Sequence, residues 1–401
     1  MKKTIIFLLF IILIGCNKKS NDVTLNESWE NIQKKSKGTV VNIYAWGGSE
    51  VINDYIDKYV GKNLKKQDIT INRVPVDDIK VIMNKLLTEK IANKKDGSVD
   101  IIWINGENFK FAKENGLLWG EFAKILPNLN YVDEKTIQSD FGEPINYLEA
   151  PWGTAQFVFA YDSEKVTYPK NHVELKEIVK KYRGKFTYPQ SSDFIGSVFL
   201  RQLFSSIDKE AYFRLVNEDL EESQIKKLLK PLWSYLNEIK PYLWREGKTY
   251  PESSGKMHEL YSMQEIYFTM DYAPLFVESR IKNGSFTKAT KTFLFENGTI
   301  FNNHYLSIPF NAKNKAAALM TINFLISFDA QYQKQIPNNW GDGNVLDFTK
   351  LTTMQKEKFD KIDIGDASIS FDVLSKNRIP EIKSKYVEII EKEWYENVAK
   401  N

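Results

Sequence analysis

Apolar residues along the chain alternate between short continuous runs and stretches spaced as on a helix. Residues 40–44 form an apolar, β-favouring run, and apolar residues at helical spacing follow it over 51–59. The same alternation recurs from 69–74 and again from 99–104, which leads into a short helical stretch. Continuous apolar strands that alternate with amphipathic helices are typical of a parallel sheet covered on both faces. The pattern therefore predicts an α/β fold.

A second series of elements begins after residue 153. A strand is predicted over 155–161, a helix from about Gly196, and a long helix over 222–240. Further strands are expected at 185–188, 267–272, 292–296 and 305–309. An amphipathic helix near 382–398 most simply packs back on the first part of the chain.

The length of 401 residues exceeds the ~100 to 200 residues of an ordinary domain, so we expect two lobes. The predicted division is a lipoprotein signal peptide over 1–15, a lipidated cysteine and tether over 16–37, the first part of lobe 1 over 38–157, lobe 2 over 158–303, and a return to lobe 1 with C-terminal helices over 304–401.

The N-terminus has the pattern of an export signal. Lys2 and Lys3 precede an apolar run over 5–14, which is too short to span the ~30 Å hydrocarbon layer of a membrane. The run ends in Leu13-Ile14-Gly15-Cys16, which resembles a bacterial lipoprotein cleavage box. We therefore expect an exported protein that is held by lipid on Cys16 at the periplasmic or extracellular face of a bacterial envelope membrane.

Composition and charge narrow the class of protein. Hydrophobic residues make up 42% of the chain, which is enough for a sizeable core, and the formal net charge of +3 gives no footprint for nucleic-acid binding. Cys16 is the only cysteine, so the exported part can form no internal disulfide.

Sequence motifs for catalysis, cofactors and metals are absent. The three histidines are scattered, and no serine elbow, Walker loop or Rossmann glycine pattern occurs. We expect no enzyme activity, no cofactor and no metal. A glycoside hydrolase that uses some non-adjacent pair of acids stays an alternative, as does an adhesin or scaffold with a vestigial cleft.

Aromatic residues stand beside acids or amides at several predicted turns. These are Trp46, Asn105 with Glu107, Trp152 with Gln156, Asp193 with Phe194, and Asp271 with Tyr272. Aromatic faces combined with carboxylates suit an organic cation. The helix starts behind Ser49 and near Gly196 could instead receive an anion such as phosphate.

Several longer strings carry a family resemblance. They are Trp46-Gly47-Gly48-Ser49, Val74-Pro75-Val76-Asp77-Asp78, Trp103-Ile104-Asn105-Gly106-Glu107-Asn108-Phe109 and Ala150-Pro151-Trp152-Gly153-Thr154-Ala155-Gln156-Phe157, with Phe186-Thr187-Tyr188-Pro189, His304-Tyr305, Ile308-Pro309-Phe310-Asn311 and Trp340-Gly341-Asp342 further on. In these strings the chain resembles the YnjB-like substrate-binding components of ABC importers over nearly its whole mature length.

The resemblance implies a fold and a role. It implies the two-lobe type II periplasmic-binding-protein fold, with a ligand cleft between α/β lobes, and capture of a small, thiamine-like molecule by hinge closure for an ABC permease and its ATPase. We expect a monomer whose leading candidates for ligand binding are Trp46, Ser49, Asn105, Glu107, Trp152, Gln156, Asp193 and Tyr272, with Tyr305 and Trp340 as second candidates.

Overall fold

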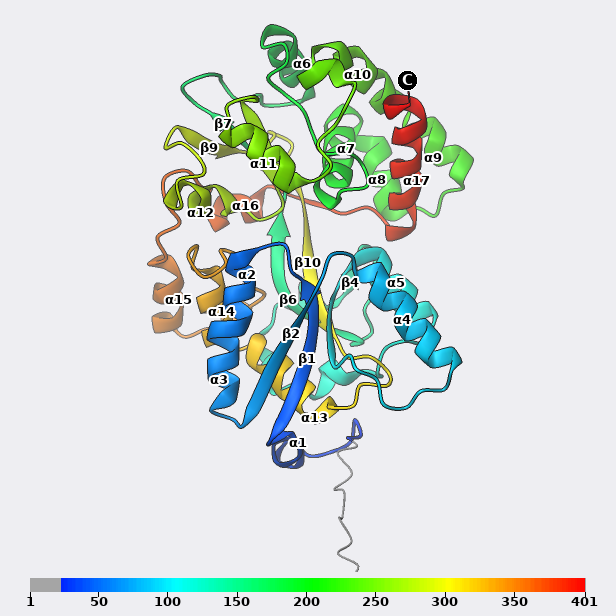
Figure 1. Cartoon of the computed structure of the whole chain (residues 1–401), viewed down its shortest axis with the longest axis vertical. Coiled ribbons are helices and arrows are strands. Elements are labelled where there is room, and N and C mark those ends of the chain that lie inside the picture. Colours follow the sequence, from blue (N-terminus) through cyan, green and yellow to red (C-terminus); the bar gives the residue numbers. More distant parts are fainter. Residues whose placement is uncertain (1–22, 401) are drawn as a thin grey trace, which may run out of the picture.

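The computed structural model describes residues 23–400, and its largest sheet fills the lower half of Figure 1. β1 (Thr39–Trp46) lies between two parallel neighbours, β2 (Ile69–Val76) and β3 (Ile101–Ile104). β10 (Thr299–Ser307) pairs antiparallel with β3 and with β6 (Glu149–Gln156). β1, β2 and β3 lie within the segments predicted as strands at 40–44, 69–74 and 99–104 or overlap them, whereas β6 and β10 begin about six residues before the predicted strands at 155–161 and 305–309. The predicted α/β class is confirmed.

Helices cover both faces of this sheet, which forms lobe 1. They are α1 (Trp29–Ser36), α2 (Glu50–Asp54), α3 (Gly61–Lys65), α4 (Ile79–Ile91), α5 (Gly106–Glu114), α13 (Lys315–Leu325), α14 (Phe328–Gln335) and α15 (Thr353–Asp360). Val41 and Ile43 of β1 pack with α13 in one apolar cluster, whereas Ile102 and Ile104 of β3 pack with α4 and α5 in another. Alternate residues of a strand point to opposite faces, so each face has its own core.

Lobe 2, the upper half of Figure 1, is built on a smaller antiparallel sheet. Its strand order is β8 (Phe268–Asp271), β7 (Val158–Asp162) and β9 (Thr290–Phe293). The helices around it are α6 (His172–Lys181), α7 (Phe194–Ile207), α8 (Lys209–Asn217), α9 (Glu222–Leu228), α10 (Lys230–Ile239), α11 (Ser254–Ser262), α12 (Phe276–Lys282) and α16 (Phe371–Lys376).

Three segments cross between the lobes. β6 leads directly into β7, β9 returns into β10, and the chain crosses again before β11 (Arg378–Pro380), which pairs with the start of β10. The side-chain amide of Gln156, at the end of β6, donates hydrogen bonds to Thr299 Oγ1 (3.1 Å) and to the carbonyl of Asn377 (3.0 Å). One side chain therefore ties all three crossing segments together.

The C-terminal helix lies on a different lobe from the one we predicted. α17 (Val387–Trp394) packs into the core of lobe 2, where Trp394 Nε1 donates to the hydroxyl of Tyr188 at 3.1 Å. The prediction that the C-terminal helix packs on lobe 1 is wrong, because an amphipathic pattern shows that a helix has an apolar face but not which surface that face covers.

The predicted strand at 185–188 is also absent from the described part of the chain. Phe186 and Tyr188 are buried, but the segment forms no ladder: the backbone N–H of Trp244, in a short 3-10 helix, donates to the carbonyl of Phe186, and that of Tyr267 donates to the carbonyl of Lys185. None of the helices within residues 23–400 is long and apolar enough to cross a membrane. The predicted signal peptide and Cys16 lie outside the described residues.

Candidate functional site

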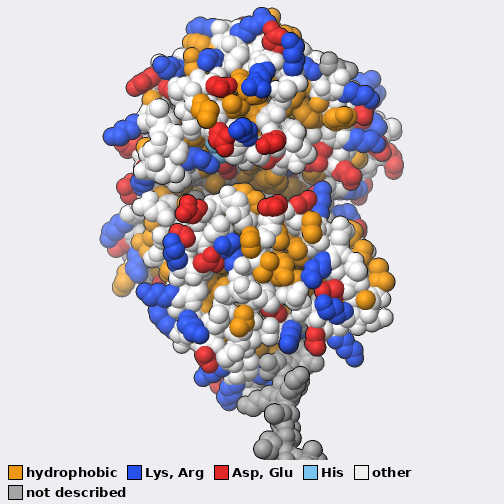
Figure 2. All heavy atoms as spheres, viewed as in Figure 1, with side chains coloured by type: hydrophobic (Ala, Val, Ile, Leu, Met, Phe, Trp, Pro, Cys, Tyr) orange, Lys and Arg blue, Asp and Glu red, His pale blue; other side chains and the backbone are white. Residues whose placement is uncertain are grey.

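A cleft of about 630 Å³ separates the two lobes. Figure 2 shows it as a groove across the middle of the molecule, with hydrophobic side chains in its depth and acidic side chains along both edges. Its lower wall comes from the ends of the lobe 1 strands, and its upper wall comes from α7, the end of β8 and α17.

The parallel strands of lobe 1 determine which residues form the lower wall of the cleft. Carboxyl ends of parallel strands meet at one edge of a sheet. Trp46 at the end of β1, Asp77 and Asp78 after β2, and Asn105 after β3 therefore all line the cleft. Trp46 is among the exposed large hydrophobic residues, which leaves its ring available at the rim. Glu107 pairs with Lys80 at 2.8 Å.

The upper wall is organised by Asp193 at the start of α7. Its Oδ1 accepts from the backbone N–H groups of Ile195 (2.9 Å) and Gly196 (3.2 Å). Phe194 stands edge-on to Tyr272, with ring centroids 5.3 Å apart. Since the Asp193 carboxylate already caps this helix, the predicted anion site near Gly196 does not form.

Acidic side chains outnumber basic ones in the lining of the cleft. They are Asp77, Asp78, Glu107, Asp193, Glu252, Asp271, Asp342 and Glu391. Among the described residues, the lining lysine and arginine side chains are Lys80, which pairs with Glu107, and Arg201, which forms a bidentate pair with Glu381 at 2.8 and 3.0 Å. The cleft therefore carries an excess of negative charge.

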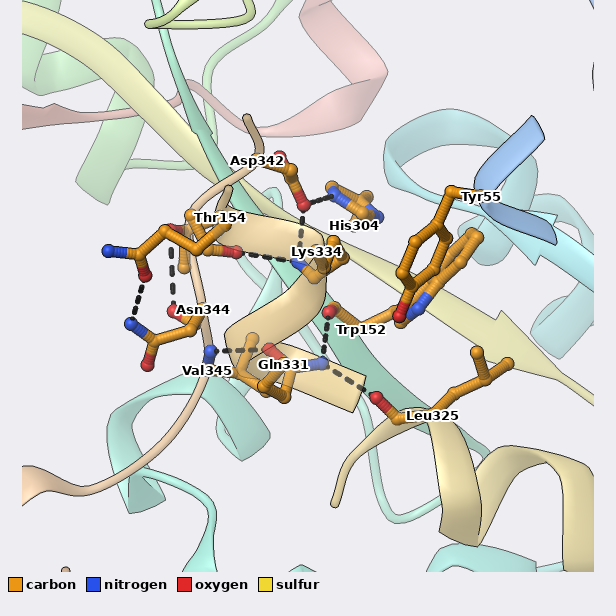
Figure 3. Close-up of polar contacts among 12 residues, drawn as sticks. Tyr55, Trp152, Thr154, His304, Leu325, Gln331, Lys334, Asp342, Asn344 and Val345 are labelled. Atoms are coloured by element: carbon orange, nitrogen blue, oxygen red, sulfur yellow. Dashed lines mark hydrogen bonds and ion pairs between the residues drawn. The ribbon is translucent and has the colours of Figure 1, made fainter. Parts of the chain in front are cut away.

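The floor of the cleft holds a buried ion cluster. In Figure 3, Lys334 points at Asp342, and the same carboxylate oxygen contacts His304 Nε2 at 2.8 Å. Lys334 also donates to the carbonyl of Gly343 at 2.6 Å. Burial acts to raise the pKa of Asp342, but Lys334 and His304 together lower it. Asp342 is therefore ionised.

Aromatic rings surround this cluster. His304 stacks on Trp340 with ring centroids 5.6 Å apart, and Trp103 lies 5.0 Å from His304. Trp103 and Trp340 line the cleft, whereas Trp152 is only 1% exposed and packs behind them, 4.8 Å from Trp340 and 5.1 Å from Trp103. Trp152 supports the floor from below.

The structure brings six of the predicted ligand-binding residues to the cleft: Trp46, Asn105, Glu107, Asp193, Tyr272 and Trp340. It places four others away from the lining. Trp152 lies beneath the floor, Ser49 precedes α2 as its N-cap without a side-chain cap bond, Gln156 ties the crossing segments, and the Tyr305 hydroxyl donates to backbone carbonyls inside lobe 1.

Sequence reasoning missed several residues that line the cleft. Glu391 was missed because its helix was assigned to the wrong lobe, and Arg201 because nothing in a helical pattern marks a buried charge. For His304, the sequence offers no signal beyond the family string His304-Tyr305. Asp342, which contacts His304, could have been predicted as a cleft residue: in Trp340-Gly341-Asp342 an acid follows an aromatic residue at a turn, as at the other candidate positions.

Comparisons with known proteins agree with this architecture. Residues 55–336 match the family described as bacterial extracellular solute-binding protein. Protein YnjB of Escherichia coli (strain K12) is 35% identical over 348 residues, which cover 86% of this chain and 89% of that protein.

Solved structures of low identity share the fold. The spermidine/putrescine ABC transporter substrate-binding protein PotD from Streptococcus pneumoniae has 14% identity and a TM-score of 0.60, covering 90% of this chain and 98% of its own. The periplasmic binding protein AfuA from Actinobacillus pleuropneumoniae, with fructose-6-phosphate bound, has 14% identity and a TM-score of 0.61 over the same shares. A polyamine carrier and a sugar-phosphate binder thus share one fold, which leaves the ligand to be inferred from the cleft itself.

Proposed function

Because this chain belongs to the bacterial extracellular solute-binding proteins of ABC transporters, we propose that it captures a small organic cation, such as a thiamine-like molecule, in the cleft between its lobes. The excess of acidic side chains in the cleft is the main support for this proposal. Its lining contains eight carboxylates, and the two cationic side chains among the described lining residues are both paired with acids. Trp46, Trp103 and Trp340 add aromatic faces, on which a cation gains attraction.

Capture proceeds by closure of the two lobes. Ligand contacts come from both walls, so a ligand that touches both stabilises the closed state over the open one. The three crossing segments act as the hinge. The protein delivers its ligand to an ABC permease, which an ATPase drives, while lipid on Cys16 holds it at the envelope membrane.

A ligand panel tests the charge preference. Thiamine, spermidine, choline, fructose-6-phosphate and glucose are added in turn to the purified chain, and the melting temperature is measured. A cation at 100 times its Kd adds about 2.7 kcal/mol to the free energy of unfolding. Stabilisation by cations supports the proposal, whereas stabilisation by fructose-6-phosphate or glucose alone contradicts it.

Affinity for a cation is expected to fall on acidification. Burial raises the pKa of both Asp193 and Glu391 above their ordinary values of 3.8 and 4.5. Both groups therefore bind protons at a higher pH than exposed carboxylates, and a cation favours their ionised forms. Calorimetric titration with choline, whose charge does not change with pH, checks this between pH 7 and pH 4. A constant Kd over that range would rule out both carboxylates as partners of the cation.

Removing the charge of Glu391 is expected to weaken binding of 1-methylnicotinamide, a flat and permanently charged ring, about tenfold. Glu391→Gln keeps the acceptor for Ser197 Oγ, which lies 2.7 Å from Glu391 Oε1. A tenfold change corresponds to ~1.4 kcal/mol, which is within the range of a lost charge pair in a partly buried site. Glu388→Gln on the exposed face of the same helix is the control. Equal Kd values for the two variants would remove Glu391 from the site.

A further inference from the structure

The edge of the lobe 1 sheet that lies opposite the cleft carries basic side chains. Parallel strands all begin at one edge of a sheet, so the segments before β1, β2 and β3 lie together, and the antiparallel β10 ends beside them. These segments are residues 34–38, 65–68, 92–98 and 309–314. They contain three, two, two and one lysines in turn, against two acids, Asp68 and Asp96. We call this surface the basic edge.

Hydrogen bonds hold the four segments of the basic edge side by side. The backbone N–H of Gly38 donates to the carbonyl of Asp68 at 2.7 Å, which joins the first two segments. The side-chain amide of Asn42 on β1 donates to the carbonyl of Ser98, in the third segment, at 3.0 Å. The backbone N–H of Gly97 donates to a carbonyl of the fourth segment at 2.7 Å. The lysines of the four segments therefore share one continuous surface.

Most of these lysines have no acidic partner. Lys35 pairs with Glu27 at 2.7 Å, and Lys94 pairs with Glu89 at 2.8 Å. The six that are exposed and form no ion pair with another described residue are Lys34, Lys37, Lys65, Lys66, Lys95 and Lys313. Lysine and arginine side chains gather around this lower end of the molecule in Figure 2. A group of basic side chains without counter-charges attracts an anionic surface.

The segment that leads back to Cys16 leaves lobe 1 at the same end. Val23, the first described residue, is buried in one apolar cluster with Ile32 of α1, and Figure 1 places α1 at the lower end of lobe 1. Cys16 precedes Val23 by seven positions, and a chain of that length spans roughly 25 Å at most. Lipid on Cys16 would therefore keep the basic edge close to the surface of the bilayer.

We propose that the basic edge docks on anionic phospholipid headgroups of the membrane that holds the protein. This inference extends the proposed lipid anchoring and is independent of the ligand. Attraction between exposed charges extends over only about 8 Å at physiological ionic strength, so the short connection to Cys16 matters because it keeps the lysines near the headgroups. The carboxylates of the cleft lie at the opposite edge of the same sheet, where an anionic membrane repels them. The protein therefore binds the membrane through lobe 1, with its cleft directed away from the lipid.

Vesicle sedimentation tests the docking without the acyl chains. The full mature chain from residue 16, with Cys16→Ser, is mixed with vesicles of phosphatidylcholine alone or with roughly one-third phosphatidylglycerol. Partitioning onto the anionic vesicles is expected to be at least about tenfold stronger. Raising the NaCl concentration to about 0.5 M is expected to abolish the difference, because salt screens the attraction. This salt series needs no further variant.

A triple variant assigns the binding to the basic edge. Lys37→Gln, Lys65→Gln and Lys66→Gln remove three exposed charges from two neighbouring segments. Each basic residue near an anionic membrane contributes up to about fivefold to partitioning, so the combined variant is expected to bind the anionic vesicles at least about tenfold more weakly. Its melting temperature is expected to match that of the parent chain, since all three side chains are exposed.

A matched control separates the position of the charges from the net charge. Lys165→Gln, Lys209→Gln and Lys288→Gln together remove three exposed lysines of lobe 2, and none of the three forms an ion pair with another described residue. The net charge changes by the same amount as in the first variant. Because these positions lie on the other lobe, the control is expected to bind the anionic vesicles as the parent chain does.

The outcomes decide for or against the membrane. Binding to phosphatidylglycerol vesicles that salt abolishes, that the basic-edge variant loses and that the lobe 2 control keeps supports the proposal. Equal partitioning of the parent chain onto the two kinds of vesicle overturns it, as does an equal loss in the two variants. Binding to inorganic polyphosphate through the same three lysines, without binding to vesicles, would assign the basic edge to an acidic polymer instead. None of these results bears on ligand capture, which the ligand panel tests separately.

Discussion

Glu381→Gln is expected to lower the free energy of unfolding by about 3 to 5 kcal/mol. The Arg201 and Glu381 side chains are 1% and 3% exposed and are joined by two hydrogen bonds. Neutralising Glu381 leaves the guanidinium buried without its counter-charge, and separating such a pair costs this much because the remaining charge has no water around it. Urea denaturation, with the midpoint and slope measured, checks the prediction.

A double variant and a surface control make the result specific. Arg201→Met combined with Glu381→Leu removes both charges and is expected to recover most of the loss, since apolar residues of similar volume replace buried ion pairs at little cost. Asp372→Asn breaks an exposed pair with Lys376 and is expected to leave stability unchanged within error. A Glu381→Gln variant as stable as Asp372→Asn would show that the pair does not stabilise the fold.

Gly153→Ala is expected to lower the free energy of unfolding by about 3 kcal/mol or more. A Cβ at this position would lie closer than 3.0 Å to Asp342 Oδ2, His304 Nε2 and Lys334 Nζ. Overpacking alone costs about 1 to 3 kcal/mol, and parting the buried ion pair adds to it. The methyl group thus acts on the cluster under the cleft, so the affinity for 1-methylnicotinamide is expected to fall as well.

Gly61→Ala is the matched control for this change. Gly61 has helical dihedral angles, and the nearest atom to an added Cβ is the carbonyl oxygen of Ile56 at 3.7 Å. Alanine there is expected to stabilise the chain by up to about 1 kcal/mol, because glycine has more conformational freedom to lose on folding. Thermal and urea unfolding of both variants compare the two positions. A stable Gly153→Ala variant would mean that the ion cluster can relax around the methyl group.

The sequence predicted the parallel core well because that core is encoded locally. The segments at 40–44, 69–74 and 99–104 became β1, β2 and β3. Val41 and Ile43 of β1, Ile69 at the start of β2, and Ile101, Ile102 and Ile104 of β3 are buried in the lobe 1 cores. The prediction of a strand at 185–188 failed because Phe186 and Tyr188 bury their side chains from a segment whose backbone carbonyls accept single hydrogen bonds from Trp244 and Tyr267 and not from a neighbouring strand. An apolar pattern predicts that a segment is buried, but it does not predict that its backbone pairs with another strand in a β-sheet.

The candidate site was predictable where it follows strand ends. Trp46 and Asn105 line the cleft because β1 and β3 deliver them to one edge. Trp152 did not reach the lining, since Pro151 and Gly153 on either side of it pair with β10 and its indole is buried beneath the floor of the cleft. Lys334 and Asp342 lie eight residues apart, at the end of α14 and in the turn after it, whereas His304 comes from β10, and no local pattern records their meeting.

The amide of Gln156 restricts how the lobes can move. It joins β6, the start of β10 and the segment before β11 at a single point, through bonds to Thr299 and Asn377. Segments that are hydrogen-bonded to one another at a single point can rotate about that point more easily than they can slide past one another. If the lobes close on a ligand as we propose, we expect them to rotate about this point, so that the permease distinguishes a closed, loaded form from an open, empty one.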